Sequence, residues 1–162
     1  MAETILVTGA SAGFGQAICQ RLVADGHRVI GAARRIEKLQ ALHEELGEAF
    51  YPLQMDVTDL SQVDHALASL PADWDQIDVL VNNAGLALGL APAYEAEVSD
   101  WLTMIQTNIV GLTYLTRQIL PQMVQRNDGY IINLGSTAGT VPYPGANIYG
   151  ASKAFVKQFS LN

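Results

Sequence analysis

The run Thr4-Ile-Leu-Val-Thr8, followed by Gly9-Ala-Ser-Ala-Gly13-Phe-Gly15, decides the fold class of this 162-residue chain. Five apolar or β-branched residues in succession are typical of a strand buried on both faces of a parallel sheet. The glycines follow directly, and a helical pattern begins at Gly13. Glycines between a strand and a helix let the backbone approach a phosphate, which the amides of the helix N-terminus favour. The spacing is G-x3-G-x-G, and a glycine-rich turn without a ligand is the alternative.

Strand-like apolar runs and helical periods alternate along the rest of the chain. We expect strands at residues 4–8, 28–33, 48–55, 78–82 and 130–134. We expect helices at residues 13–24 and 36–46, from 58 or 59 to before Pro71, at 98–124 with a bend or an end near Pro121, and from about Tyr149 onward. This alternation predicts a single α/β domain over residues 1–162, with a Rossmann-type, doubly wound parallel sheet. The complete fold has at least six strands, so we interpret the chain as truncated, with the C-terminal strands six and seven missing.

Composition excludes several classes of protein. Charged residues make up only 15% of the chain, against about 25% in typical domains, and 49% are hydrophobic. The net charge is −7 and the nine Lys and Arg residues form no long run, which argues against a nucleic-acid partner. The chain has a single cysteine, Cys19, which we expect to be a small core residue. Because no disulfide can form within the chain, a reducing, cytoplasmic compartment is expected. No apolar run approaches the ~18 residues of a membrane span, and the three histidines have no metal-ligand spacing.

Two arginines, Arg34 and Arg35, follow the second expected strand. In dinucleotide-binding domains an acid at this position bonds the ribose hydroxyls of NAD, whereas an arginine accommodates the 2′-phosphate of NADP. Paired guanidinium groups can hold a phosphate with forked hydrogen bonds. A solvated basic pair is the alternative, although cations at a helix N-terminus oppose the helix dipole. The sequence therefore favours NADP as the cofactor.

A tyrosine and a lysine, Tyr149 and Lys153, are spaced four residues apart on the last expected helix. Positions i and i+4 share a helix face, so the ammonium can lie close to the phenol. A nearby positive charge favours the phenolate and makes the phenol usable as an acid or a base. Ser136 lies thirteen residues upstream and offers a hydroxyl that could orient an oxygen-bearing substrate. Taken alone, such a pair is more often an ordinary pair on a solvated helix face.

Six features in register resemble the classical short-chain dehydrogenases/reductases across essentially the whole chain. They are Thr8–Gly15, Asp56-Val57, Asn82-Asn83-Ala84-Gly85, Asn108, Ser136 and Tyr149-x-x-x-Lys153. The segments NNAGLALGLA (82–91), IINLGSTAG (131–139) and 149–162 are most similar to the NADP-dependent serine/allo-threonine and 3-hydroxy acid dehydrogenases.

The resemblance implies roles for individual residues. The implied cofactor-binding set is Gly9, Ser11, Ala12, Gly13, Phe14, Gly15, Arg34, Arg35, Asp56, Val57, Asn83, Ala84, Gly85, Tyr149 and Lys153. Within it, Gly9–Phe14 would cradle the pyrophosphate, the two arginines would hold the 2′-phosphate, Asp56 and Val57 would line the adenine, and Asn83 would lie against its ribose.

The implied catalytic set is Asn108, Ser136, Tyr149 and Lys153, with no metal. Ser136 would hydrogen-bond the reacting substrate oxygen, and Tyr149 would exchange its proton. Lys153 would hold the nicotinamide ribose, and Asn108 would anchor a proton-relay water.

The expected function is therefore hydride transfer between NADP(H) and a 3-hydroxy acid/3-oxo acid pair of the serine, allo-threonine or 3-hydroxypropionate type. Alternatives are another carbonyl reductase of the same superfamily, acting on 3-oxoacyl or sugar-alcohol substrates, a non-catalytic NADP-binding protein, or an inactive fragment. The resemblance also implies a homodimer or homotetramer, because relatives pair through the helices that correspond to residues 98–124 and the Tyr149 helix.

Overall fold

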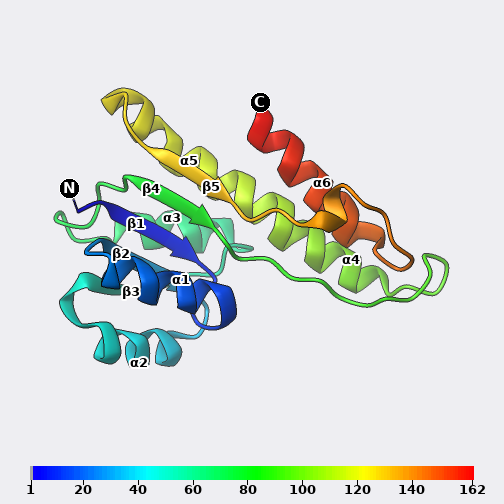
Figure 1. Ribbon diagram of the computed structural model, residues 1–162, viewed down its shortest axis with the longest axis horizontal. Coiled ribbons are helices and arrows are strands. Elements are labelled where there is room, and N and C mark those ends of the chain that lie inside the picture. The colour runs from blue at the N-terminus through cyan, green and yellow to red at the C-terminus, as the bar shows by residue number, and fades with distance from the viewer. Residues whose placement is uncertain (1) are drawn as a thin grey trace.

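A computed structural model describes residues 2–162 and contains one five-stranded, all-parallel sheet. Its strands are β1 (Thr4–Thr8), β2 (Arg28–Ala33), β3 (Phe50–Gln54), β4 (Val79–Asn82) and β5 (Tyr130–Asn133), in the order β3-β2-β1-β4-β5. The chain moves outward from β1 in one direction to β3 and then returns to place β4 and β5 on the other side (Figure 1). This reversal between β1 and β4 is the topological switch point of the doubly wound fold. The predicted fold class is confirmed.

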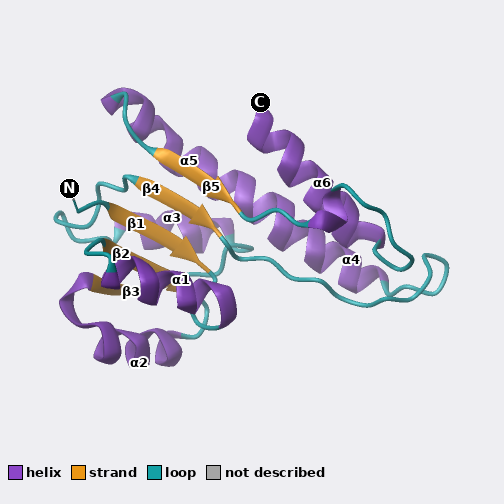
Figure 2. Cartoon of the chain, in the orientation of Figure 1, coloured by secondary structure: helices purple, strands orange, loops and turns teal. Residues whose placement is uncertain are grey.

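Helices cover both faces of the sheet (Figure 2). The buried side chains between helices and sheet form two separate hydrophobic clusters. On one face, α1 (Gly13–Ala24) and α2 (Ile36–Leu46) contribute Cys19, Leu39 and Leu42 to a cluster with Val7 and Phe50. On the other face lie α3 (Leu60–Ala68) and α5 (Leu112–Arg126). β1 is buried along its whole length because both clusters pack against it. Cys19 is a buried core residue, as predicted.

The long helix expected at residues 98–124 is interrupted by a wider turn. It consists of α4 (Val98–Ile105), a π-helical turn at Gln106–Gly111, which we call the π turn, and α5. Pro121 lies inside α5 without ending it. The helix ends instead at Asn127, whose left-handed backbone (φ 54°) is a common helix stop. The buried contacts of α5 with the sheet outweigh the single hydrogen bond that a proline removes.

Several other boundaries differ from the predicted ones by one or two residues. β3 begins at Phe50 rather than residue 48, because Gly47–Ala49 form a 3₁₀ turn. The last helix, α6 (Asn147–Leu161), begins two residues before Tyr149, after a turn in which Gly145 has positive φ. In the part of the chain that the structure describes, no helix has the length and apolar character needed to cross a bilayer.

Candidate functional site

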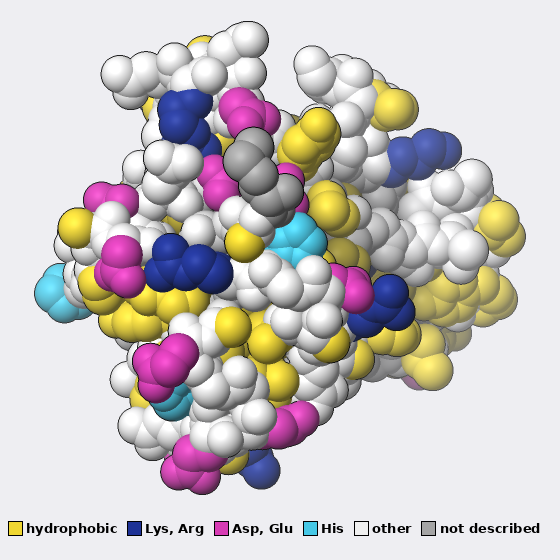
Figure 3. All heavy atoms as spheres, turned by 60° about the vertical axis from the view of Figure 1, so that its left-hand side comes forward, with side chains coloured by type: hydrophobic (Ala, Val, Ile, Leu, Met, Phe, Trp, Pro, Cys, Tyr) yellow, Lys and Arg dark blue, Asp and Glu magenta, His cyan; other side chains and the backbone are white. Residues whose placement is uncertain are grey.

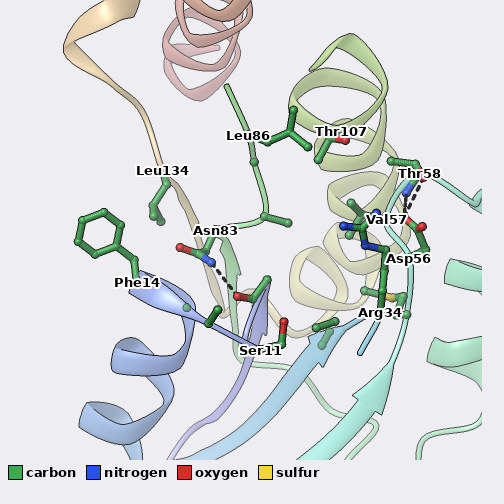
Figure 4. Close-up of a pocket in the computed structure, with 18 of the residues that line it drawn as sticks. Ser11, Phe14, Arg34, Asp56, Val57, Thr58, Asn83, Leu86, Thr107 and Leu134 are labelled. Atoms are coloured by element: carbon green, nitrogen blue, oxygen red, sulfur yellow. Dashed lines mark hydrogen bonds between the residues drawn. The ribbon is translucent and has the colours of Figure 1, made fainter. Parts of the chain in front are cut away.

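A pocket of about 600 Å³ opens at the carboxyl ends of the strands, across the switch point. Each of the five strands contributes a lining residue within two positions of its end. These are Gly9, Arg34, Asp56, Asn83 and Gly135. Figure 4 shows side chains from these segments around one hollow, with Leu86 and Thr107 on the side of the π turn. Ligands of doubly wound sheets bind at this position.

The glycine turn brings the backbone of β1 and α1 close to the segment after β4. Gly9 has φ 69°, in the left-handed region, and a Cβ there would stand 2.8 Å from Nδ2 of Asn83. A Cβ on Gly15 would overlap the carbonyl oxygen of Gly9. A side chain at Gly15 would therefore push α1 away from the end of β1, and one at Gly9 would push away the segment after β4.

Thr8 and Asn83 hold this close approach in place. The hydroxyl oxygen of Thr8 accepts hydrogen bonds from the amides of Asn83 (3.1 Å) and Ala84 (2.9 Å). In return, Nδ2 of Asn83 donates to the carbonyl oxygen of Thr8 at 2.8 Å. These bonds join residues about 75 positions apart in sequence, so the two loops that form the floor of the pocket are fixed together.

The N-terminus of α1 is open to an anionic group. Its N-cap residue is Ala12, which has no side chain that could bond the first-turn amides, and the first turn contains no acidic residue. The first amides of a helix have no partner within the helix and carry a partial positive charge. Because this N-terminus borders the pocket, it suits a phosphate.

The pocket is positively charged although the chain is acidic. Arg34, Arg35 and Lys153 line it together with a single carboxylate, Asp56, which gives 3 − 1 = +2, against −7 for the whole chain. On the opposite face, at the amino ends of the strands, basic and acidic side chains are interspersed (Figure 3). Nη2 of Arg35 donates to the hydroxyl of Ser11 at 2.8 Å, so one guanidinium reaches back to the glycine turn.

Asp56 and Val57 form the wall next to the arginines. One carboxylate oxygen of Asp56 accepts hydrogen bonds from both the amide (2.9 Å) and the hydroxyl (2.8 Å) of Thr58. A Cβ on Gly111, at the end of the π turn, would stand 2.6 Å from the carbonyl oxygen of Val57. The π turn therefore packs directly against this wall.

Tyr149 and Lys153 lie together at the other end of the pocket. Both line it from α6, and the Lys153 side chain is buried, with 8% of the residue exposed. Nζ of Lys153 donates to the carbonyl oxygen of Leu134 at 2.8 Å. Burial lowers the pKa of Lys153 below its ordinary value of 10.5. Tyr149 is half-buried and reaches the same hollow.

Asn108 and Ser136 are adjacent to the pocket, next to Thr107 and Gly135, but are not among the described residues that line it. Both hydrogens of the Asn108 amide nitrogen are engaged, by the carbonyl oxygen of Leu86 (2.9 Å) and the hydroxyl of Ser152 (3.1 Å). The Ser136 hydroxyl accepts a bond from the amide of Ala138 at 3.2 Å. A Cβ on Gly85 would lie 3.2 Å from Oδ1 of Asn108 and 3.4 Å from Nζ of Lys153, so both side chains approach this glycine.

The structure thus brings nearly all the predicted site residues to one pocket. Of the fifteen predicted cofactor-binding residues, Gly13 alone is not in the lining. Ten other lining residues were not predicted as site residues: Ala32, Ala33, Met55, Thr58, Leu86, Ala87, Thr103, Thr107, Leu134 and Gly135. The rule that sites form after strand ends could have found Leu134 and Gly135, since they follow β5. Among the described residues, no three His, Cys, Asp or Glu side chains gather as a metal site.

Fold and pocket together define a Rossmann-type α/β domain with a site for a phosphate-bearing ligand. The sequence model of the short chain dehydrogenase family matches residues 3–162, and the chain belongs to that family. It is 61% identical over 158 residues to the NADP-dependent 3-hydroxy acid dehydrogenase YdfG of Salmonella typhi, an alignment that covers 98% of this chain and 64% of that protein. It is 53% identical to the serine 3-dehydrogenase of Rhizobium radiobacter, with coverage of 99% and 64%.

A solved structure, the closed form of a serine dehydrogenase complexed with NADP⁺, superposes with a TM-score of 0.97 at 59% identity. The superposition covers 98% of this chain and 64% of the other. The chain therefore spans about 64% of the length of these relatives.

Proposed function

We propose that residues 1–162 form a single NADP-binding domain of an oxidoreductase that interconverts a 3-hydroxy acid and its 3-oxo partner. The substrates would be of the serine, allo-threonine or 3-hydroxypropionate type. One observation carries the proposal: Tyr149 and the buried Lys153 line the same pocket as Arg34 and Arg35. One ligand in this pocket could therefore contact both the arginine pair, which suits a phosphate, and the Tyr149/Lys153 pair, which suits proton transfer. The names of the relatives, which specify NADP, serine and 3-hydroxy acids, support the choice of coenzyme and substrate.

The lining residues fit the coenzyme as follows. The uncapped N-terminus of α1 and the turn from Gly9 to Phe14 would hold the pyrophosphate. Arg34 and Arg35 would hold the 2′-phosphate, which explains why a basic pair is placed at the end of β2. Asp56, Val57 and Asn83 would contact the adenosine, with Ala84 and Gly85 leading toward the Tyr149 end.

NADP(H), when bound, supplies the hydride chemistry. The chain's own groups must then handle the proton of the substrate oxygen, a task that typically accounts for ~10²–10⁴-fold in rate. Tyr149 would give or take that proton, and Lys153 would hold the nicotinamide ribose beside it. Ser136 keeps its hydroxyl hydrogen when it accepts the Ala138 amide, so it can donate to the same substrate oxygen.

Asn108 would act on a relay water through its carbonyl oxygens, because both hydrogens of its side-chain nitrogen are already engaged. Such a water would lie between Asn108 and Lys153, whose side chains both approach Gly85.

We further propose a homodimer or homotetramer in the cytoplasm. Val98, Leu102, Leu120 and Val124 are exposed apolar residues on α4 and α5, the helices expected to pair. The lone, buried Cys19 thiol supports a reducing compartment.

The proposal can be tested by assaying the protein that carries this chain against a panel of coenzymes and substrates. We expect oxidation of L-serine, L-allo-threonine or 3-hydroxypropionate with NADP⁺, and at least tenfold lower kcat/KM with NAD⁺. Faster turnover of 3-hydroxyacyl thioesters or of sugar alcohols would assign the protein to another reductase of the superfamily. Tight NADPH binding without turnover of any of these substrates would indicate a non-catalytic binding protein.

A further inference from the structure

Ser152 is a completely buried serine that lies between Tyr149 and Lys153 in the sequence. It lies on α6, three positions after Tyr149 and next to Lys153, and none of its surface is exposed. Its hydroxyl donates to the carbonyl oxygen of Tyr149 at 2.8 Å and accepts from Nδ2 of Asn108 at 3.1 Å. The Ser152 hydroxyl therefore joins the backbone of α6 to the π turn.

The Asn108 side chain continues this connection to the loop after β4. Its Oδ1 accepts from the amide of Leu86 and its Nδ2 donates to the carbonyl of Leu86, both at 2.9 Å. This two-point contact fixes the plane of the carboxamide, so the remaining amide hydrogen has one direction, toward Ser152. Asn108 is 1% exposed, and water is poorly placed to replace the serine.

α6 is thereby anchored to two different strand ends through adjacent residues. Lys153 bonds Leu134 after β5, and Ser152 bonds Asn108 and, through it, Leu86 after β4. Without the second anchor, the first turn of α6 could rotate about the Lys153 contact. Such a rotation would move the phenol of Tyr149 while leaving the ammonium in place.

We propose that Ser152 is a positioning residue, whose hydroxyl sets the orientation of Tyr149 by holding the Tyr149 carbonyl and the Asn108 carboxamide at once. The proposal rests on the proposed function, because it concerns the residue assigned the proton. It predicts that loss of the hydroxyl lowers kcat and leaves coenzyme binding nearly unchanged, since the phosphate-binding groups lie on other elements.

The same helix provides a matched control. The hydroxyl of Ser160 donates to the carbonyl oxygen of Val156 at 2.7 Å and accepts from Nδ2 of Asn133 at 2.9 Å. Ser160 thus makes the same two kinds of hydrogen bond as Ser152, but it lies two turns further along α6 and is itself exposed. Ser160→Ala removes equivalent bonds without touching the connection to Asn108.

The experiment compares the wild-type protein with Ser152→Ala, Ser152→Thr and Ser160→Ala. We expect Ser152→Ala to lower kcat about three- to tenfold, a change of the size that either of its two hydrogen bonds typically contributes, with the Kd for NADPH within twofold of wild type. Ser152→Thr keeps the hydroxyl and should recover most of kcat, and Ser160→Ala should leave kcat unchanged. If Ser152→Ala does not fold, Ser152→Cys takes its place with the same expected order.

A second readout needs no substrate. By NMR, hydrogen exchange of the Leu86 amide should be at least threefold faster in Ser152→Ala than in wild type, and unchanged in Ser160→Ala. Equal effects of Ser152→Ala and Ser160→Ala on kcat and on this exchange rate would overturn the positioning role. If the wild-type protein shows no turnover, the proposed function fails, and the Leu86 exchange rate alone decides for or against the connection through Ser152.

Discussion

Nζ of Lys153 donates a hydrogen bond to the carbonyl oxygen of Leu134 across 2.8 Å. The contact ties α6 to the segment that follows β5, and it does so with a buried group. Burial disfavours the charged form and lowers the pKa of Lys153, so the folded chain holds this proton less tightly than the unfolded chain does.

The stability that Lys153 contributes should consequently depend on pH. Between the lowered pKa of the folded state and the ordinary value of 10.5, the unfolded chain binds more protons, so stability rises with pH. We expect the wild-type protein to gain stability relative to Lys153→Met between pH 7.5 and pH 10, because methionine does not titrate. Urea unfolding of both proteins at the two pH values measures the difference. A constant difference would show that burial does not shift the lysine.

Replacing Thr8 by valine should loosen the floor of the pocket. Valine keeps the shape but leaves the amides of Asn83 and Ala84 without their acceptor. Buried unsatisfied donors cost about 1–3 kcal/mol each. Because these two amides are only partly buried, we expect Thr8→Val to lower the free energy of unfolding by roughly 2–4 kcal/mol, below the upper end of that range. Thr8→Ser retains the hydroxyl and should lose less. The idea fails if urea unfolding finds serine as destabilising as valine.

Removing both arginines should change the coenzyme preference rather than the fold. Arg34→Ala together with Arg35→Ala should reduce the NADPH-over-NADH affinity ratio at least tenfold, since the 2′-phosphate loses its charged partners. The control, Arg21→Ala with Arg117→Ala, removes the same charge from exposed positions outside the pocket lining. Fluorescence titration with both coenzymes gives the ratio. An unchanged ratio in the Arg34/Arg35 variant, or an equal change in the control, would remove the basis for assigning NADP.

Cys19 should be unreactive in the folded protein. Its thiol is fully buried on α1, and burial raises its pKa to about 12. At pH 8 the thiolate fraction is then roughly 10³-fold smaller than for an ordinary thiol. A disulfide reagent should label the protein promptly in denaturing urea and at least ~10³-fold more slowly in buffer. Rapid labelling of native protein would place the thiol at the surface.

The sequence predicted the fold well where local signals and burial agree. The apolar run at Thr4–Thr8 and the stop at Asp25-Gly26 gave the observed bounds of β1 and α1. A doubly wound parallel sheet could be predicted because parallel strands joined by helices have few allowed arrangements. The glycine turn and the residues after each strand end could likewise be placed, since these ends converge in a doubly wound sheet.

Features that depend on distant contacts could not be predicted in this way. The π turn exists where Gly111 meets the carbonyl of Val57 and where Asn108 pairs with Leu86. Neither contact has a local sequence signal. From the sequence alone, Ser152 is an ordinary helical serine. Its role depends on Asn108, which lies 44 positions away in sequence and is brought next to it only by the fold.

The most direct test of the proposed mechanism is the turnover and coenzyme affinity of Tyr149→Phe. Phenylalanine keeps the ring at the end of the pocket and removes only the hydroxyl that would exchange the proton. In the protein that carries this chain, we expect kcat with NADP⁺ and the preferred 3-hydroxy acid to fall by at least ~10²-fold. The Kd for NADPH should stay within about threefold, because the groups proposed to hold the phosphates are untouched. A Tyr149→Phe protein that turns over within a few fold of wild type would contradict the proposed role of Tyr149.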